Sequence, residues 1–100
     1  MATLHILNAA PAKSKQLHSC LRVLSAGDGI LLCGEAVQAL RTGSAAAKQL
    51  FACEQKYHLY ALQEDLAARA IDTAQLPVTV VDYPAFVALT VEYARVNSWT

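Results

Sequence analysis

The chain has little charge and no excess of either sign. Its 100 residues hold eight Lys and Arg against eight Asp and Glu, and the charged fraction of 16% lies below the ~25% of average soluble domains. The absence of a basic excess argues against tight nucleic-acid binding through phosphate contacts. Because 55% of the residues are hydrophobic and so short a domain exposes much of its surface, we expect some apolar surface to meet a partner chain.

Long apolar runs are also missing. No run approaches the ~20 residues that a membrane-spanning helix needs. The segment Leu4–Leu7 is too short for the core of a signal peptide, and no basic residues precede it. The sequence therefore predicts a cytoplasmic protein without membrane contact, and its length predicts one domain, residues 1–100.

Patterns for metals, disulfides and phosphate groups are absent from the sequence. Cys20, Cys33 and Cys53 match no zinc, disulfide or paired-cysteine spacing. The loops contain no glycine-rich nucleotide motif, and Gly27 and Gly29 precede a strand, as turn residues do. We expect neither a metal nor a cofactor.

Short β-rich runs alternate with helical patterns, which is typical of an α/β domain with a mostly parallel sheet between two helical layers. The expected strands cover residues 3–7, 30–33, 57–62, 78–81 and 96–100, and the expected helices cover residues 14–25, 35–40, 45–53, 64–71 and 82–94. The segment 78–81 is the most β-branched, so we place it at the centre of the sheet. Residues 96–100 are expected to form an edge strand pinned by Trp99.

Several side chains are expected to stabilise helix ends. Ser44 and Asp82 precede helical segments and are good N-cap residues. Ser14 is expected to begin the first helix. Asp65 and Arg69 stand four residues apart, a spacing that favours an ion pair.

Cys20 is the candidate site residue, in the role of a persulfide carrier. Two interpretations of this thiol stay open, one as a core residue and one as a reactive group. One face of the predicted helix, at the spacing i, i+3, i+4 and i+7, consists of Leu17, Cys20, Leu21 and Leu24. This stripe predicts a thiol packed in the core. A reactive thiol would instead need exposure and a lowered pKa, to which the positive charge of His18 or Arg22 could contribute.

The remaining chemically capable residues have simpler interpretations. His5 and His58 lie inside predicted strands and are expected to be core or interface residues. Cys33 ends a strand, where α/β sites often lie, but the run before it predicts burial. Trp99 is expected to be a packing anchor.

Four stretches together resemble a known family: Leu4–Asn8, Leu62–Ala70, Val81–Thr90 and Asn97–Trp99. In order, spacing and total length they resemble the TusB/DsrH family of small sulfur-relay subunits. The likeness covers essentially the whole chain, although none of the stretches is a catalytic motif.

The resemblance implies a DsrE-like α/β/α domain in a heterohexamer with TusC-like and TusD-like subunits. Such a complex takes persulfide sulfur from a TusA-like donor and passes it to a TusE-like acceptor, toward 2-thiolation of the tRNA wobble uridine. The transferring cysteine there belongs to the TusD-like subunit. The resemblance thus implies a non-catalytic subunit that meets tRNA only indirectly.

Two alternatives remain. DsrH proteins of sulfur oxidisers carry a cysteine in their first helix, and Cys20 looks like that residue, which would make this chain a persulfide carrier. A freestanding α/β module that binds a small ligand is the other alternative, and the missing phosphate loop disfavours it.

Overall fold

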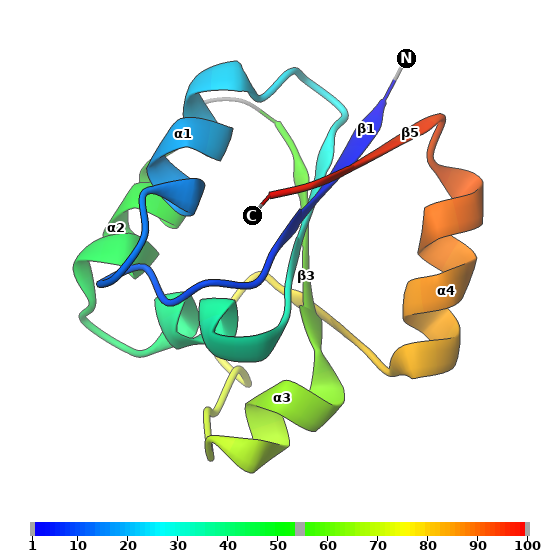
Figure 1. Ribbon diagram of the computed structural model, residues 1–100. Helices are drawn as coiled ribbons and strands as arrows, with labels where there is room; N and C mark the ends of the chain where they lie inside the picture. The colour runs from blue at the N-terminus through cyan, green and yellow to red at the C-terminus, as the bar shows by residue number, and fades with distance from the viewer. Residues whose placement is uncertain (1, 54–55, 100) are drawn as a thin grey trace.

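The computed structural model describes residues 2–53 and 56–99, which form one five-stranded sheet (Figure 1). The strands are β1 (Thr3–Leu7), β2 (Gly29–Leu32), β3 (His58–Leu62), β4 (Thr79–Val81) and β5 (Arg95–Ser98). Their order is β4-β3-β2-β1-β5, and each neighbouring pair is parallel. The predicted α/β fold with a parallel sheet is confirmed.

Helices cover the two faces of the sheet unequally. The helical elements are α1 (Gln16–Val23), the 3-10 helix η1 (Gly34–Leu40), α2 (Ala45–Ala52), α3 (Gln63–Ala68) and α4 (Tyr83–Glu92). Figure 1 shows α1 and α2 on one side of the sheet and α4 alone on the other. Because β1 to β4 follow one another in one direction, right-handed crossovers place their connections on one face. The return from β4 to β5 places α4 on the opposite face.

The predicted helix-end contacts are present. Ser44 and Asp82 each accept a backbone N–H from three residues later, at 3.0 Å and 2.9 Å. Asp65 and Arg69 approach to 3.7 Å. Helix α1 begins at Gln16, two residues after Ser14. Ser14 lies just outside the helix, and its hydroxyl accepts the backbone N–H of Gln16 at 3.1 Å.

The predicted central position of the β-branched strand is wrong. Strand β4 lies at an edge of the sheet, and Val80 is 41% exposed. β-branched residues favour any extended segment, so their number does not distinguish an edge strand from a central one. Strand β5 forms the other edge, as predicted. The backbone N–H of Trp99 continues the pairing of β5 with β1 by donating to the Ile6 carbonyl at 2.9 Å. Thr100, the last residue of the predicted strand, lies outside the described residues.

Two separate cores follow from this arrangement. The larger core fills the space under α1, η1, α2 and α3, and its fully buried members include Leu7, Ile30, Leu32, Val37 and Leu50. The smaller core lies under α4 and contains Leu4, Leu31, Leu62 and Val81. A single helix, α4, therefore covers the smaller core on one face of the sheet, whereas β5 at the edge stays exposed.

Gly29 allows α4 to approach the sheet closely. A Cβ atom at Gly29 would lie 2.5 Å from Oη and 2.8 Å from Cζ of Tyr93. The Tyr93 hydroxyl is in turn held at 3.0 Å by the hydroxyl of Tyr60. We expect Gly29→Ala to lower the free energy of unfolding in urea by about 1–3 kcal/mol, because the tyrosine ring must leave its place.

The same substitution in a Tyr93→Ala background is the control for this prediction. There the added methyl group meets no ring and only the end of the Leu4 side chain, at 3.1 Å, so we expect it to cost less than about 1 kcal/mol. An equal cost in both backgrounds would show that contact with Tyr93 is not the cause.

Candidate functional site

The first candidate site is the crevice at the carboxyl ends of β1 and β5, where the strand order reverses and where α/β sheets commonly bind ligands. The side chain of Gln16, which is buried, fills this place. Its amide nitrogen donates to the Trp99 carbonyl at 2.9 Å and to Asn8 Oδ1 at 3.2 Å. Its amide oxygen accepts the N–H groups of Asn8 and Ala9 at 3.2 Å and 3.1 Å. The crevice is thus closed by the protein's own polar contacts.

A second polar group lies at the carboxyl ends of β2 and β3. The Gly34 N–H donates to the Asp65 carboxylate at 2.7 Å, and the Arg69 guanidinium lies 2.6 Å from Glu35. Cys33 stands next to this group, directly after β2, and its thiol faces the Leu7 carbonyl at 3.5 Å. Burial, with a smaller contribution from the charge of Asp65, raises the pKa of the Cys33 thiol. This arrangement braces η1 against α3 and disfavours a thiolate.

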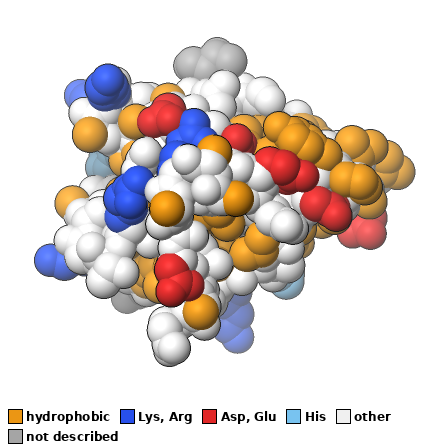
Figure 2. All heavy atoms as spheres, turned by 90° about the horizontal axis from the view of Figure 1, so that it is seen from below, with side chains coloured by type: hydrophobic (Ala, Val, Ile, Leu, Met, Phe, Trp, Pro, Cys, Tyr) orange, Lys and Arg blue, Asp and Glu red, His pale blue; other side chains and the backbone are white. Residues whose placement is uncertain are grey.

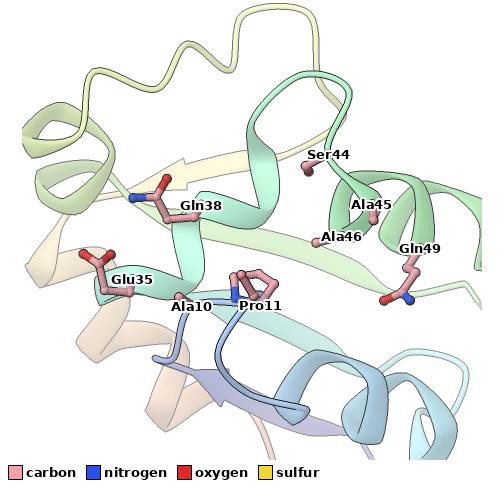
Figure 3. A pocket seen from close by; sticks show the side chains of 9 residues that line it. Ala10, Pro11, Glu35, Gln38, Ser44, Ala45, Ala46 and Gln49 are labelled. Atoms are coloured by element: carbon pink, nitrogen blue, oxygen red, sulfur yellow. The ribbon is translucent and has the colours of Figure 1, made fainter.

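A pocket of about 450 Å³ lies between the loop after β1, η1 and α2 (Figure 3). Its wall is mainly small and apolar, with Ala10 and Pro11 on one side and Ala45 and Ala46 on the other. Four polar side chains also line it: Glu35, Gln38, Ser44 and Gln49. These lining residues include no cysteine or histidine and only one carboxylate, so the pocket holds no nucleophile paired with a base.

Cys20 lies in the larger core and is 0% exposed. Burial raises the pKa of this thiol to about 12, and the negative charge of Asp28 adds to the effect. His18 and Arg22 do not accompany it, since they line a surface groove of about 360 Å³ together with Cys53. In this conformation Cys20 is a neutral thiol beyond the reach of a donor persulfide.

A buried polar network ties the two ends of the described chain together. The Trp99 indole N–H donates to Nδ1 of His5 at 3.2 Å. Since that nitrogen accepts, the proton of the neutral ring is on Nε2, which donates to the Asp28 carboxylate at 3.2 Å. Asp28 also accepts the N–H groups of Thr3 and Ser25, both at 3.0 Å. His5 is a satisfied core histidine and Trp99 a packing anchor, as predicted.

This network makes stability depend on pH. Burial alone would raise the pKa of Asp28, but the hydrogen bonds from Thr3, Ser25 and His5 outweigh it and hold the pKa below its usual value. A carboxyl group with a lowered pKa in the folded state stabilises the fold above its unfolded pKa of about 3.9. We expect the free energy of unfolding to fall as the pH is lowered from about 5 to 2. In Asp28→Asn, whose side chain does not titrate, this part of the pH dependence should be missing.

Two expectations from the sequence need comment. His58 is exposed at the start of β3 and is therefore not a core residue, whereas the alternative that it lies at an interface stays a prediction. Gln16 and Asp28 were missed. Asp28 could have been found, because an acidic residue directly before a buried strand indicates a carboxylate that needs hydrogen-bond partners. A single Gln in a helix gives no such indication.

Neither a metal centre nor a membrane span is found in the part of the chain that the structure describes. Within residues 2–53 and 56–99, no three side chains of His, Cys, Asp or Glu lie together as metal ligands would. The helices of the same residues are all too short or too polar to cross a membrane.

Comparison with known sequences gives matches over nearly the whole chain. Residues 9–96 match the protein family described as "DsrH like protein". A "Protein TusB" of Erwinia tasmaniensis is 37% identical over 97 residues, covering 96% of this chain and 99% of that protein. A "Protein TusB" of Escherichia coli is 36% identical over 98 residues, with the same coverage.

Comparison with solved structures supports the fold. The crystal structure of the ychN protein from Escherichia coli aligns with a TM-score of 0.73 at 20% identity, covering 99% of this chain and 100% of that chain. A Thermotoga maritima protein solved by solution NMR aligns with a TM-score of 0.64 at 21% identity, covering 92% of this chain and 93% of that chain. At these identities the likeness is one of fold alone.

Proposed function

Because this chain belongs to the DsrH-like family and is similar to TusB proteins over nearly its whole length, we propose that it is a non-catalytic subunit of a cytoplasmic sulfur-relay complex. It completes a heterohexamer with TusC-like and TusD-like subunits. The assembled complex takes persulfide sulfur from a TusA-like donor and hands it to a TusE-like acceptor for 2-thiolation of the tRNA wobble uridine. This chain itself makes no direct contact with the tRNA.

The observation that carries the proposal is the sequence identity of 36–37% with TusB proteins over nearly their whole length. Its non-catalytic part is supported by the state of the cysteines. Cys20 is fully buried, and the pKa values of both Cys20 and Cys33 are raised, burial being the main cause. A sulfur carrier needs an accessible thiolate to attack the donor's outer sulfur.

The alternative proposal makes Cys20 a persulfide carrier, in tRNA thiolation or in sulfur oxidation. Its support is that Cys20 lies in the first helix, where the DsrH proteins of sulfur oxidisers carry a cysteine. It requires α1 to move away from the sheet during transfer, because the thiol is enclosed in the larger core.

Deletion of the gene, followed by mass spectrometry of nucleosides from total tRNA, tests the proposal. We expect the 2-thiolated wobble uridine to fall, and expression of the wild-type chain to restore it. Native mass measurement of the tagged chain should also find TusC-like and TusD-like chains in equal amounts. Unchanged thiolation in the deletion strain would refute the role in tRNA modification.

Complementation with Cys20→Ala and Cys20→Ser separates the two proposals. A non-catalytic subunit predicts that both variants restore thiolation whenever the complex assembles. A carrier predicts that both fail although the complex is intact. Two variants are needed because a serine hydroxyl in the core is costly, whereas alanine leaves only a small cavity.

A further inference from the structure

Helix α4 is apolar on both sides. Its inward residues Ala85, Phe86 and Leu89 pack on the smaller core. Its outward residues Tyr83, Val87 and Val91 recur every four positions and are 52%, 59% and 81% exposed. Glu92 is the only charged residue in its ten positions. Helices that are apolar all round are normally covered on all sides.

The helices on the opposite face of the sheet carry more charged and polar residues at their exposed positions. The exposed positions of α1 include His18 and Arg22, and those of α2 include Lys48 and Gln49. Each of these helices also exposes one large apolar residue, Val23 in α1 at 58% and Phe51 in α2 at 39%. Helix α4 differs in exposing three large apolar residues in one row along its length.

The charges around α4 are of one sign. Asp82 caps its start and Glu92 ends it, so two carboxylates stand about 15 Å apart at the ends of the apolar face. Arg95 follows closely, but strand alternation turns its side chain to the other face of the sheet, together with Asn97 and Trp99. The other seven lysines and arginines lie outside α4, at Lys13, Lys15, Arg22, Arg41, Lys48, Lys56 and Arg69. Figure 2 shows hydrophobic and acidic side chains on the side of α4 and basic ones mainly on the other side.

We propose that the outward face of α4, formed by Tyr83, Val87 and Val91, docks a different protein chain whose apolar surface is flanked by Lys or Arg. This inference rests on the proposed function, since it identifies the occupant as a neighbouring subunit of the relay complex. A second copy of this chain fits poorly, because a two-fold contact through this face sets Asp82 and Glu92 of both copies against each other. A membrane fits poorly too, because anionic headgroups repel the same carboxylates.

The test is co-expression of the tagged chain with the TusC-like and TusD-like chains of its own organism. The variant carries Val87→Glu and Val91→Glu, which place carboxylates at exposed positions and leave both cores intact. The matched control is Val23→Glu, because Val23 is 58% exposed at the end of α1 on the opposite face. A second variant, Glu92→Lys, reverses one flanking charge.

We expect the double variant to recover at least tenfold less of the partner subunit than the wild type, and Glu92→Lys to recover less as well. Val23→Glu should recover the wild-type amount, and circular dichroism should show all variants folded. If the wild type assembles and the double variant assembles equally, the docking inference is overturned while the proposed function stands. If the wild type assembles with no relay chain, the proposed function fails and the inference fails with it.

Two further outcomes would overturn the choice of occupant. One is a wild-type chain that, on its own, forms a dimer in native mass measurement that the double variant abolishes. The other is sedimentation of the isolated chain with phosphatidylglycerol vesicles, lost in the same variant. We expect neither.

Discussion

Native Cys20 is expected to react with iodoacetamide roughly a thousandfold more slowly than a free cysteine at neutral pH. Only the thiolate reacts, and burial raises the pKa of Cys20 to about 12. The fraction of Cys20 present as thiolate at neutral pH therefore falls by roughly a thousandfold. The absence of any exposed surface on Cys20 slows the reaction further. Mass spectrometry of alkylated peptides, sampled over time, measures the rate at each cysteine.

Cys53 is the internal comparison, because it is half-buried beside a surface groove in the same chain. We expect Cys53 to be labelled well before Cys20 in the native protein, and both to be labelled at similar rates in urea. Labelling of Cys20 as fast as Cys53 without denaturant would mean that α1 opens readily. That result would favour the alternative in which Cys20 carries sulfur.

Replacement of Asp28 by alanine is expected to lower the free energy of unfolding by about 3–5 kcal/mol. The carboxylate, 3% exposed, accepts hydrogen bonds from Thr3, Ser25 and His5, and its removal leaves these donors without their partner. A domain of this size is commonly stable by only about 5–15 kcal/mol. We therefore expect much of the variant to be unfolded at 37 °C, as urea titration followed by circular dichroism would show.

Asp72→Ala is the matched control. Asp72 also accepts a backbone N–H, that of Ala74 at 2.9 Å, but it does so at the surface, where water replaces the lost partner. Its cost should stay below about 1 kcal/mol. Equal costs for Asp28→Ala and Asp72→Ala would contradict the role assigned to the buried network.

Much of the fold was predictable because local signals agreed with one another. The alternation of β-rich runs and helical stripes predicted the parallel α/β sheet, and side-chain oxygens at Ser44 and Asp82 predicted two helix starts. The stripe around Cys20 also predicted its burial, since a residue at core spacing faces the sheet whatever its chemistry. Strand order was not predictable in this way, and β4 was misplaced because β-propensity is the same at an edge as at the centre.

The candidate site depended more strongly on tertiary structure. The pairing of His5 with Asp28 joins residues 23 positions apart, and the contact of Trp99 with His5 joins residues 94 positions apart. Gln16 closes the crevice between β1 and β5 only because β5 returns to that edge of the sheet. Such contacts follow from chain topology and not from local spacing.

The sequence by itself determined the fold class, the family, the low charge and the apolar surplus, because these depend on composition and on neighbours along the chain. Only the tertiary structure decided where the surplus of apolar residues lies on the surface. Four helical elements share one face of the sheet and cover it, whereas the single crossover from β4 to β5 leaves α4 alone on the other. The direction of the crossovers, which no local pattern encodes, thus leaves the outer face of α4 exposed.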